Sequence, residues 1–355
     1  MHTHTPASLI LNRHTELLNQ HTIIFAGDIQ DNFAAEFKQS KVLTSQFHHA
    51  KRLEKNGIDT VYKAIFDKLD VEHATLLVYY WPKVKEEALF QLTQLLSIVN
   101  EQTEILIVGE NRVGVRSIEN RFNDILTVQK IDTAKRCSLY YAKLNTVPKF
   151  DIENYWKSYS LPNGKMHYAL PGVFSRDHLD SGSRLLISSF IPEDKHTPKN
   201  PKHTLAFLTT PQLKADVLDL CCGAGVIALA LHEHFPNLTW TLADSQAQSI
   251  ESAKRNMNEI NLQAKIIASD ILSEIEGKFD MIISNPPFHD GKQTDYAITE
   301  RLISAAPKYL RDFGALRIVA NGFLPYETFM QSAFGNVEII AKNTQFTVYQ
   351  SVKLR

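Results

Sequence analysis

Short apolar runs alternate along the chain with longer stretches in which apolar residues recur at helical spacing. The runs at 75–80 and 105–108 each end at turn-forming residues, as buried strands do. Between them, the stretch 86–100 has apolar residues at 88, 89, 92, 95, 96 and 99, a spacing that predicts a helix. Strands that alternate with helices indicate an α/β fold with a mostly parallel sheet.

The same alternation starts again at residue 216. It predicts strands over 217–220, 239–243, 265–268, 279–284 and 315–320, with helices between them. The last two apolar runs, 337–340 and 346–354, have no long helix between them, so we expect them to pair antiparallel. Residues 145–170 contain several proline and glycine turns and are predicted to be a linker. Asp180-Ser181-Gly182-Ser183 is typical of an N-cap, for a helix that begins near residue 184.

Apolar runs of the first half can be aligned with runs of the second half. The segments 76–82, 105–108 and 139–144 align with 281–287, 316–319 and 349–354, at shifts of 205, 211 and 210 residues. Three similar shifts indicate that one sheet domain was duplicated. We therefore predict two tandem Rossmann-like α/β domains, 1–155 and 156–355, each a mostly parallel sheet with an antiparallel last strand. The copies differ at the turns: Tyr80 stands where Asn285 does, and Gly27 stands alone where the second half has Gly223 and Gly225.

Composition supports a chain with two globular domains of ordinary size. The 355 residues are 44% hydrophobic and 22% charged, with a net charge of −1, so the chain as a whole is not basic enough to indicate nucleic-acid binding. Charge is nevertheless uneven, because eight Lys or Arg face three acidic residues between positions 112 and 149. This stretch is either an ordinary solvated surface or an RNA-binding surface that includes Arg112, Arg116 and Arg121.

The cysteines and the lack of long apolar segments indicate where in the cell the protein is expected. Cys137, Cys221 and Cys222 have neither the number nor the spacing of a disulfide framework or a metal site, so we expect reduced thiols and no metal. The first residues show no signal-peptide pattern, and no apolar run approaches the roughly 20 residues that a membrane span needs. The sequence therefore predicts a cytoplasmic protein without a membrane partner.

The segment Asp219-Leu220-Cys221-Cys222-Gly223-Ala224-Gly225 joins the first strand of the second half to its helix. Its small residues allow the backbone to approach a ligand at the carboxyl edge of a parallel sheet. Asp244, 19 residues beyond Gly225 at the end of the next strand, is placed to bind ribose hydroxyls. Asp270 ends the third strand and is expected near an adenine amino group.

The ligand of this segment is either a nicotinamide dinucleotide or S-adenosylmethionine. Ala228 supplies the third small residue of the dinucleotide pattern, so that pattern is not excluded. Asp219 argues the other way, because a carboxylate at the strand end suits a cationic or amino-bearing ligand and would repel a pyrophosphate. Together with the Asn-Pro-Pro turn at 285–287, it favours S-adenosylmethionine. The expected cofactor-binding residues are Asp219, Cys221, Gly223, Gly225, Asp244 and Asp270.

A predicted strand at 281–284 stops abruptly at Asn285-Pro286-Pro287-Phe288. Two prolines fix φ and remove two N–H donors, which leaves the Asn285 amide oxygen and the Pro286 carbonyl as acceptors on a stiff rim. A planar amino group has two N–H donors and a ring face, so it fits these acceptors and the Phe288 ring. We therefore expect Asn285, Pro286, Pro287 and Phe288 to bind the reacting amino group. His289 and Asp290 either accept a proton or shape the loop; a strong base is not required, because the proton leaves after nitrogen becomes cationic.

These motifs together resemble those of known enzymes. The segment 219–225, followed by Ser-Asn-Pro-Pro-Phe-His-Asp-Gly at 284–291, is similar to the seven-stranded S-adenosylmethionine-dependent methyltransferases that modify exocyclic amino groups. With the segments 109–117 and 171–177, the chain resembles the ribosomal RNA small subunit methyltransferase C family over nearly its whole length. Cys221 is a departure, because the wider motif usually has glycine at this position and a thiol would crowd the cofactor.

The resemblance implies methylation of the N2 amino group of one guanine in 16S rRNA, within the assembled small (30S) ribosomal subunit. It also implies that the domain 1–155 is a degenerate methyltransferase-like copy that serves RNA docking and supports the catalytic domain 156–355. We expect the protein to act as a monomer.

Other functions are compatible with the Asn-Pro-Pro-aromatic turn by itself. They are guanine-N2 methylation of large-subunit rRNA, methylation of adenine N6 and methylation of a glutamine amide in a release factor. The duplicated first half favours a large folded RNA over a peptide. A non-catalytic rRNA assembly factor is a further alternative, which the intact Asn285-Pro286-Pro287-Phe288 argues against.

Overall fold

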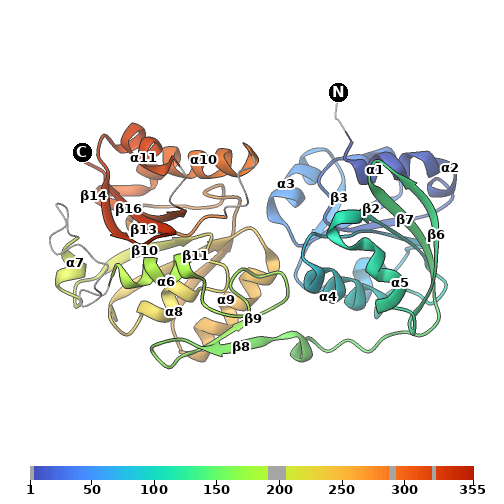
Figure 1. The fold of residues 1–355 in the computed structure, drawn as a ribbon, viewed down its shortest axis with the longest axis horizontal. Coiled ribbons are helices and arrows are strands. Elements are labelled where there is room, and N and C mark those ends of the chain that lie inside the picture. Colours follow the sequence, from blue (N-terminus) through green and yellow to red (C-terminus); the bar gives the residue numbers. More distant parts are fainter. Residues whose placement is uncertain (1–3, 191–204, 288–292, 322–324) are drawn as a thin grey trace. The chain divides into compact units, whose positions relative to one another are not determined.

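The protein is described by a computed structural model that covers residues 4–190, 205–287, 293–321 and 325–355. It separates into two compact units, Met1–Trp156 and Lys157–Arg355, which we call the first and second unit (Figure 1). Each unit contains a seven-stranded, mostly parallel sheet covered by helices. The predicted fold class, two α/β sheet domains in tandem, is therefore confirmed.

The sheet of the first unit has the strand order β3-β2-β1-β4-β5-β7-β6. Its first five strands are parallel, and β7 runs antiparallel to both β5 and β6. The central strand β4 is buried at all five positions, which explains its uninterrupted apolar run. The strands are β1 (Ile23–Gly27), β2 (Ser40–Thr44), β3 (Asp59–Tyr62), β4 (Leu76–Tyr80), β5 (Glu104–Glu110), β6 (Leu126–Ala134) and β7 (Cys137–Leu144). The α-helices are α1 (Pro6–Leu11), α2 (Thr15–Leu18), α3 (Phe47–Lys55), α4 (Lys85–Leu96) and α5 (Ile118–Arg121).

The second unit repeats this topology with the strand order β12-β11-β10-β13-β14-β16-β15. β16 runs antiparallel to both β14 and β15, so the last two strands pair antiparallel, as predicted. The strands are β10 (Ala215–Leu220), β11 (Leu238–Asp244), β12 (Ala264–Ala268), β13 (Phe279–Ser284), β14 (Leu310–Asn321), β15 (Glu338–Lys342) and β16 (Phe346–Val352). The α-helices are α6 (Ser181–Ser188), α7 (Ala206–Thr209), α8 (Val226–Leu231), α9 (Ala247–Glu259), α10 (Gln293–Tyr309) and α11 (Tyr326–Phe334).

Strand register shows how the two copies correspond. Leu77 pairs with Ile105 and Ile282 pairs with Leu316, so the predicted alignment of these strands agrees with their pairing. The last strand is different: Ile107 pairs with Tyr140, whereas Ile318 pairs with Tyr349. The two last strands therefore correspond at a shift of 209 residues, and the predicted shift of 210 is wrong by one. The sequence of this strand alternates in part between apolar and polar residues, but β16 is buried at every position, so the alternation did not fix its register.

The predicted linker at 145–170 is only partly irregular. Its second part forms the antiparallel hairpin of β8 (Lys157–Ser160) and β9 (Met166–Ala169), which belongs to the second unit. Asn256 of α9 holds β9, since its side chain bonds the Tyr168 N–H and carbonyl at 2.8 Å each. The hairpin is thus stabilised by a partner far along the chain, and local sequence pattern alone did not reveal it. Strands β2, β3 and β6 of the first unit were not predicted either; β3 and β6 are the two edge strands of the sheet and are only partly buried.

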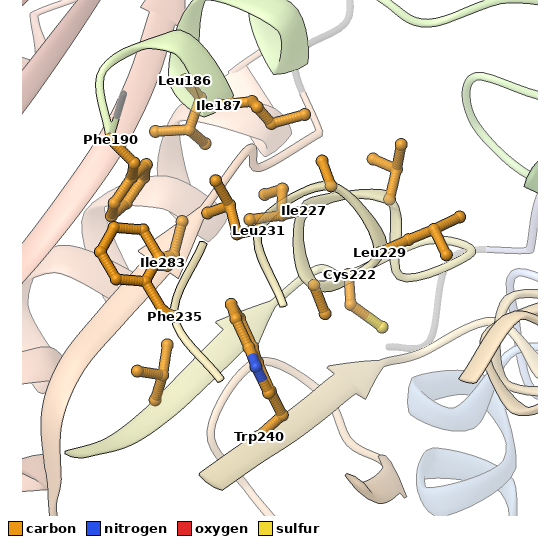
Figure 2. Close-up of a cluster of buried hydrophobic side chains, with 14 of the residues drawn as sticks. Leu186, Ile187, Phe190, Cys222, Ile227, Leu229, Leu231, Phe235, Trp240 and Ile283 are labelled. Carbon is orange, nitrogen blue, oxygen red and sulfur yellow. The ribbon is translucent and has the colours of Figure 1, made fainter. Parts of the chain in front are cut away.

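An apolar cluster fixes the helices that border the candidate site. Figure 2 shows side chains of α6, α8 and β11 directed toward one another, with Trp240 of β11 almost fully buried. Cys222 lies in the same cluster at 4% exposure. The segment that follows β10 and the helix α6 are therefore anchored to one core, which keeps the site residues that they carry in place.

Candidate functional site

Four polar residues predicted as site residues lie at the carboxyl edge of the second sheet. Asp219 is near the end of β10, Asp244 ends β11, Asp270 follows β12 and Asn285 follows β13. These strands are parallel neighbours, so their carboxyl ends meet at one edge. The structure therefore brings together residues that are up to 66 positions apart in the chain.

Hydrogen bonds tie the loops at this edge to one another. The Gly223 N–H donates to Asp244 Oδ2 at 2.9 Å, and the Ser269 N–H donates to the Asp244 carbonyl oxygen at 2.9 Å. Ser284 Oγ donates to the Leu220 carbonyl oxygen at 2.7 Å. The carboxyl ends of β10, β11, β12 and β13 are thus joined into one connected rim.

The segment Cys221–Gly225 has a backbone that favours small residues. Cys221, Gly223 and Gly225 have φ angles of 60°, 54° and 75°, all left-handed. A Cβ on Gly225 would lie 2.8 Å from Leu242 Cδ2, so any side chain there would clash with the core. Among the described residues, a Cβ on Gly223 would meet only the Phe174 carbonyl oxygen, at 4.0 Å. The part of the chain that the structure describes therefore leaves open space beside Gly223, and the ligand cradle stays a prediction.

Asp219 is a buried carboxyl group without a hydrogen-bond partner. It is 0% exposed, and neither carboxyl oxygen is bonded to any described residue. Burial, together with the nearby Asp244, raises the pKa of Asp219 well above its usual value. An unpaired buried carboxyl costs folding free energy, so this position is suited to a ligand that donates hydrogen bonds or carries positive charge.

Asp244 and Asp270 have different surroundings. Asp244 accepts the N–H groups of Gly223 and Gln246, one on each carboxyl oxygen, both at 2.9 Å. Hydrogen bonds from the Ser245 backbone and the Ser249 side chain also reach this carboxyl, so several of its lone pairs are used within the protein. Burial raises the pKa of Asp244, although these backbone hydrogen bonds lower it. Asp270 is partly buried and lies 3.5 Å from the guanidinium of Arg301.

Asn285 is held by two residues of the α6 N-terminus. Its Nδ2 donates to Ser183 Oγ at 2.8 Å and to Asp180 Oδ2 at 3.3 Å, while Oδ1 is buried and has no partner among the described residues. Asp180 is also the N-cap, since its side chain accepts the Ser183 N–H at 3.0 Å. A carboxylate only accepts hydrogen bonds, so the amide must turn its NH₂ toward α6 and its oxygen away.

Asp180 and Ser183 were predicted as part of a helix cap, and no role in the site was expected of them. The cap signature was a usable signal for the helix, but its contact with Asn285 spans more than 100 residues. Phe174 was also missed: it is 54% exposed, and its carbonyl oxygen faces Gly223. It lies in the segment 171–177, which had carried the family resemblance without an assigned role.

The remaining predicted residues of the turn are only partly described. Pro286 is buried and Pro287 is exposed. Phe288, His289 and Asp290 lie outside the described residues. Cys221 is partly buried beside the apolar cluster under α10, and burial raises the pKa of its thiol. All three cysteines are free, and the described residues contain no group of ligands suited to a metal ion. Within the same residues, no helix is long and apolar enough to cross a membrane.

The three arginines predicted to bind RNA are exposed on the first unit. Arg112 forms an ion pair with Glu110, and Arg116 Nε donates to Asn111 Oδ1 at 3.3 Å. Arg121 ends α5. Arg112 and Arg116 follow β5 and therefore lie near the carboxyl edge of the first sheet.

Comparisons with known proteins find matches over both units. The family "Methyltransferase small domain" matches residues 165–350, and "Methyltransferase small domain N-terminal" matches residues 8–159. The chain is 42% identical to the ribosomal RNA small subunit methyltransferase C of Salmonella paratyphi B, over 100% of this chain and 99% of that protein. It is 43% identical to the protein of the same name from Yersinia pestis, over 98% and 95%.

A solved structure shares the fold of the described chain. It is the 16S rRNA N2 methyltransferase of T. thermophilus in complex with AdoMet and guanosine, with a TM-score of 0.76 at 17% identity. The similarity covers 93% of this chain and 88% of that chain, so it extends over both units.

Proposed function

Because the chain belongs to the ribosomal RNA small subunit methyltransferase C family, we propose that it methylates the N2 amino group of a guanine in 16S rRNA within the assembled 30S subunit. The methyl donor is S-adenosylmethionine. One observation carries the proposal: Asn285 Oδ1 is buried, unpaired among the described residues and oriented by Ser183 and Asp180. An acceptor fixed in this way is suited to a planar amino group.

The residues at the carboxyl edge fit the cofactor. The unpaired carboxyl of Asp219 suits an amino-bearing ligand, the side of Gly223 is open, and Asp244, which ends β11, is the acid expected to bind ribose hydroxyls. Asp270 would lie toward the adenine end, at the end of β12. When bound, the cofactor supplies a methyl group that its sulfonium has already activated. The protein residues therefore have the tasks of binding and alignment.

The residues of the turn orient the nucleophile. The N2 lone pair is conjugated with the guanine ring while the amino group is flat. Asn285 Oδ1 and the Pro286 carbonyl would accept its two hydrogens and favour a pyramidal nitrogen. Each such bond contributes on the order of 1 kcal/mol, more where water is excluded. Phe288 would stack on the base, which contributes roughly 1–3 kcal/mol and offsets the unstacking of the target from the RNA.

The division of labour follows the two units. The second unit, Lys157–Arg355, corresponds to the domain expected at 156–355 and holds the cofactor and the reacting base. The first, 1–155, docks the RNA through a surface that includes Arg112, Arg116 and Arg121, and supports the catalytic unit. We propose that the protein works as a monomer in the cytoplasm, because one chain contains both functions.

Transfer of labelled methyl groups tests the proposal directly. Purified protein is given tritiated S-adenosylmethionine and either naked 16S rRNA, 30S subunits, 50S subunits or whole ribosomes, and the labelled nucleoside is identified by mass spectrometry. The expected product is N2-methylguanosine in 16S rRNA, formed fastest in 30S subunits. Label on the large-subunit rRNA, on adenine N6 or on protein would replace the proposed substrate. Absence of any transfer would favour an assembly factor.

A further inference from the structure

The turn between β6 and β7 carries two cations on a backbone that side-chain-bearing residues seldom adopt. Ala134 pairs with Cys137, so Lys135 and Arg136 form a two-residue hairpin turn. Both have left-handed φ angles, 52° and 64°. Hairpin turns of this kind favour Asn-Gly, because Gly has no Cβ and Asn tolerates the left-handed region. The chain thus keeps two long cationic side chains where they weaken the turn.

No contact within the described residues explains these side chains. Lys135 and Arg136 are both exposed, and neither forms an ion pair with a described residue. The nearest acidic residues on the adjoining strands, Asp132 and Glu110, are engaged with other cations. The two charges are therefore available to an external ligand of negative charge.

The turn is part of a larger basic surface. Because β7 runs antiparallel to β5, the turn lies at the carboxyl edge of the first sheet. The Asn111 N–H donates to the Arg136 carbonyl oxygen at 2.9 Å, and Asn111 Oδ1 accepts Arg116 Nε. Asn111 therefore joins the turn to the segment that carries Arg112 and Arg116. We call Arg112, Arg116, Lys135 and Arg136 the basic edge.

We propose that Lys135 and Arg136 bind phosphates of the rRNA substrate. Long exposed cations at the tip of a hairpin can reach a phosphate backbone, and such contacts position a nucleic acid without reading its bases. Asn and Gly would stabilise the turn but carry no charge, so a phosphate-binding role explains why the less stable pair Lys135 and Arg136 is present. The identity of the ligand as rRNA rests on the proposed function, whereas the site itself rests on the turn and its charges.

The test exchanges the turn for one that should be more stable. Lys135→Asn with Arg136→Gly is compared with Lys135→Gln with Arg136→Gln, which removes the charges but keeps the unfavourable backbone. A control pair, Lys38→Gln with Lys68→Gln, removes two exposed charges of the same unit that precede β2 and β4, at the opposite edge. Affinity for naked 16S rRNA is measured at salt concentrations from about 50 to 200 mM, and unfolding is followed by calorimetry.

The expected result separates binding from stability. Both turn variants should lower the slope of log affinity against log salt by about 1.4–1.8, since two phosphate contacts are lost. Only the Asn-Gly variant should unfold at a higher temperature, by about 2–6 °C. Slopes equal to that of the control pair would overturn the proposal and leave the turn a solvated surface.

Methyl transfer by the wild-type protein is measured in parallel. A wild type that methylates 16S rRNA, combined with unchanged slopes in the turn variants, would refute only the phosphate site. A wild type that transfers no methyl group to naked 16S rRNA or to 30S subunits, combined with the expected loss of slope, would refute the proposed reaction and leave the phosphate site supported.

Discussion

The two units have the same sheet topology but carry different side chains at corresponding positions. By strand register, Tyr80 of the first unit corresponds to Asn285, and Phe25 corresponds to Asp219. Tyr80 is 3% exposed, and its hydroxyl bonds Ser8 Oγ at 2.9 Å, just as Asn285 bonds Ser183. The same helix, α1 in one copy and α6 in the other, therefore supplies the same serine contact.

The first unit has an aromatic side chain, Phe25, at the position where the second unit has the carboxyl of Asp219. Phe25 packs with the rings of Phe33, Phe37 and Tyr80, at centroid distances of 5.7–6.5 Å. Asp219 instead remains buried and unpaired among the described residues. Apolar burial stabilises a domain, whereas an unpaired carboxyl destabilises it. The second unit thus retains an unfavourable buried group where a ligand could satisfy it, whereas the corresponding position of the first unit is apolar core.

The loop after the first strand differs in the same sense. Gly27 corresponds to Cys221, and both have a left-handed φ, 92° and 60°. A Cβ on Gly27 would lie 2.1 Å from the Tyr80 carbonyl oxygen, so the first unit closes directly over this position. The second unit has room for the Cys221 side chain there. The thiol is therefore tolerated by the fold, and its effect on the cofactor stays a prediction.

The largest effect is expected at the position that differs between Asn285 and Tyr80. Asn285→Ala removes one acceptor for the target amino group, so the methyl-transfer rate should fall at least about 10²-fold, which corresponds to a loss of about 2.7–4 kcal/mol. Cofactor affinity should stay within a few-fold, as measured by calorimetry. Asn285→Asp should keep partial activity, because a carboxylate still accepts. Tyr80→Phe is the matched control and should leave the rate unchanged; a near wild-type rate in Asn285→Ala would show that the amino group is bound elsewhere.

A second prediction concerns the pair Asp219 and Phe25. Asp219→Leu removes an unpaired buried carboxyl, so it should stabilise the ligand-free protein by about 1–3 kcal/mol and abolish measurable cofactor binding. Because burial raises the pKa of Asp219, protonation stabilises the folded state at low pH, and this contribution is lost as pH rises through the folded-state pKa. The stability gain of the variant should therefore grow with pH above the usual Asp range.

Phe25→Leu is the control for that experiment. It should destabilise the first unit without changing cofactor affinity, and wild-type calorimetry should show one cofactor per chain. Two cofactors per chain would contradict the prediction that only the second unit binds S-adenosylmethionine.

The third prediction concerns the serine contact that the two units share. Ser183→Ala leaves Asn285 in place but removes the shorter of its two hydrogen bonds, so the amide is less well oriented. We expect kcat to fall about tenfold, with KM for 30S subunits and cofactor affinity nearly unchanged. Ser183→Thr, which keeps the hydroxyl, should recover part of the rate. Ser8→Ala in the first unit should lower stability by about 1 kcal/mol and leave kcat intact; equal losses of kcat in both variants would point to a general folding defect.

The smallest effect is expected on the surface of the first unit. Reversal of Arg112, Arg116 and Arg121 to Glu should weaken 30S binding and lower its salt slope by roughly 2–3, with cofactor affinity unchanged. The same reversal at three exposed lysines of the second unit, Lys214, Lys265 and Lys308, serves as the comparison. If both triple variants lose the same slope, the first unit has no special role in docking and those arginines are an ordinary solvated surface.

Local sequence was sufficient for most of the fold and for part of the site. Apolar runs that end at Gly or Asn-Pro-Pro are local signals, so the central strands, the duplication and the residues Asp219, Asp244 and Asn285 could be predicted before any contact was known. The carboxyl ends of neighbouring parallel strands lie at one edge of the sheet, so these polar groups were expected to lie close together. The two prolines after Asn285 predicted a stiff turn that carries hydrogen-bond acceptors.

Only the tertiary structure decided which partners complete these groups. Asp180 and Ser183 contact Asn285 across more than 100 residues, β9 depends on Asn256, and the register of β16 is set by β14 because both of its faces are buried. The left-handed turn at Lys135 and Arg136 likewise follows from the pairing of β6 with β7. Such contacts cannot be predicted from a short stretch of sequence, because they depend on the free energy of the whole folded chain. Where they conflict with local conformational preference, the tertiary contacts prevail.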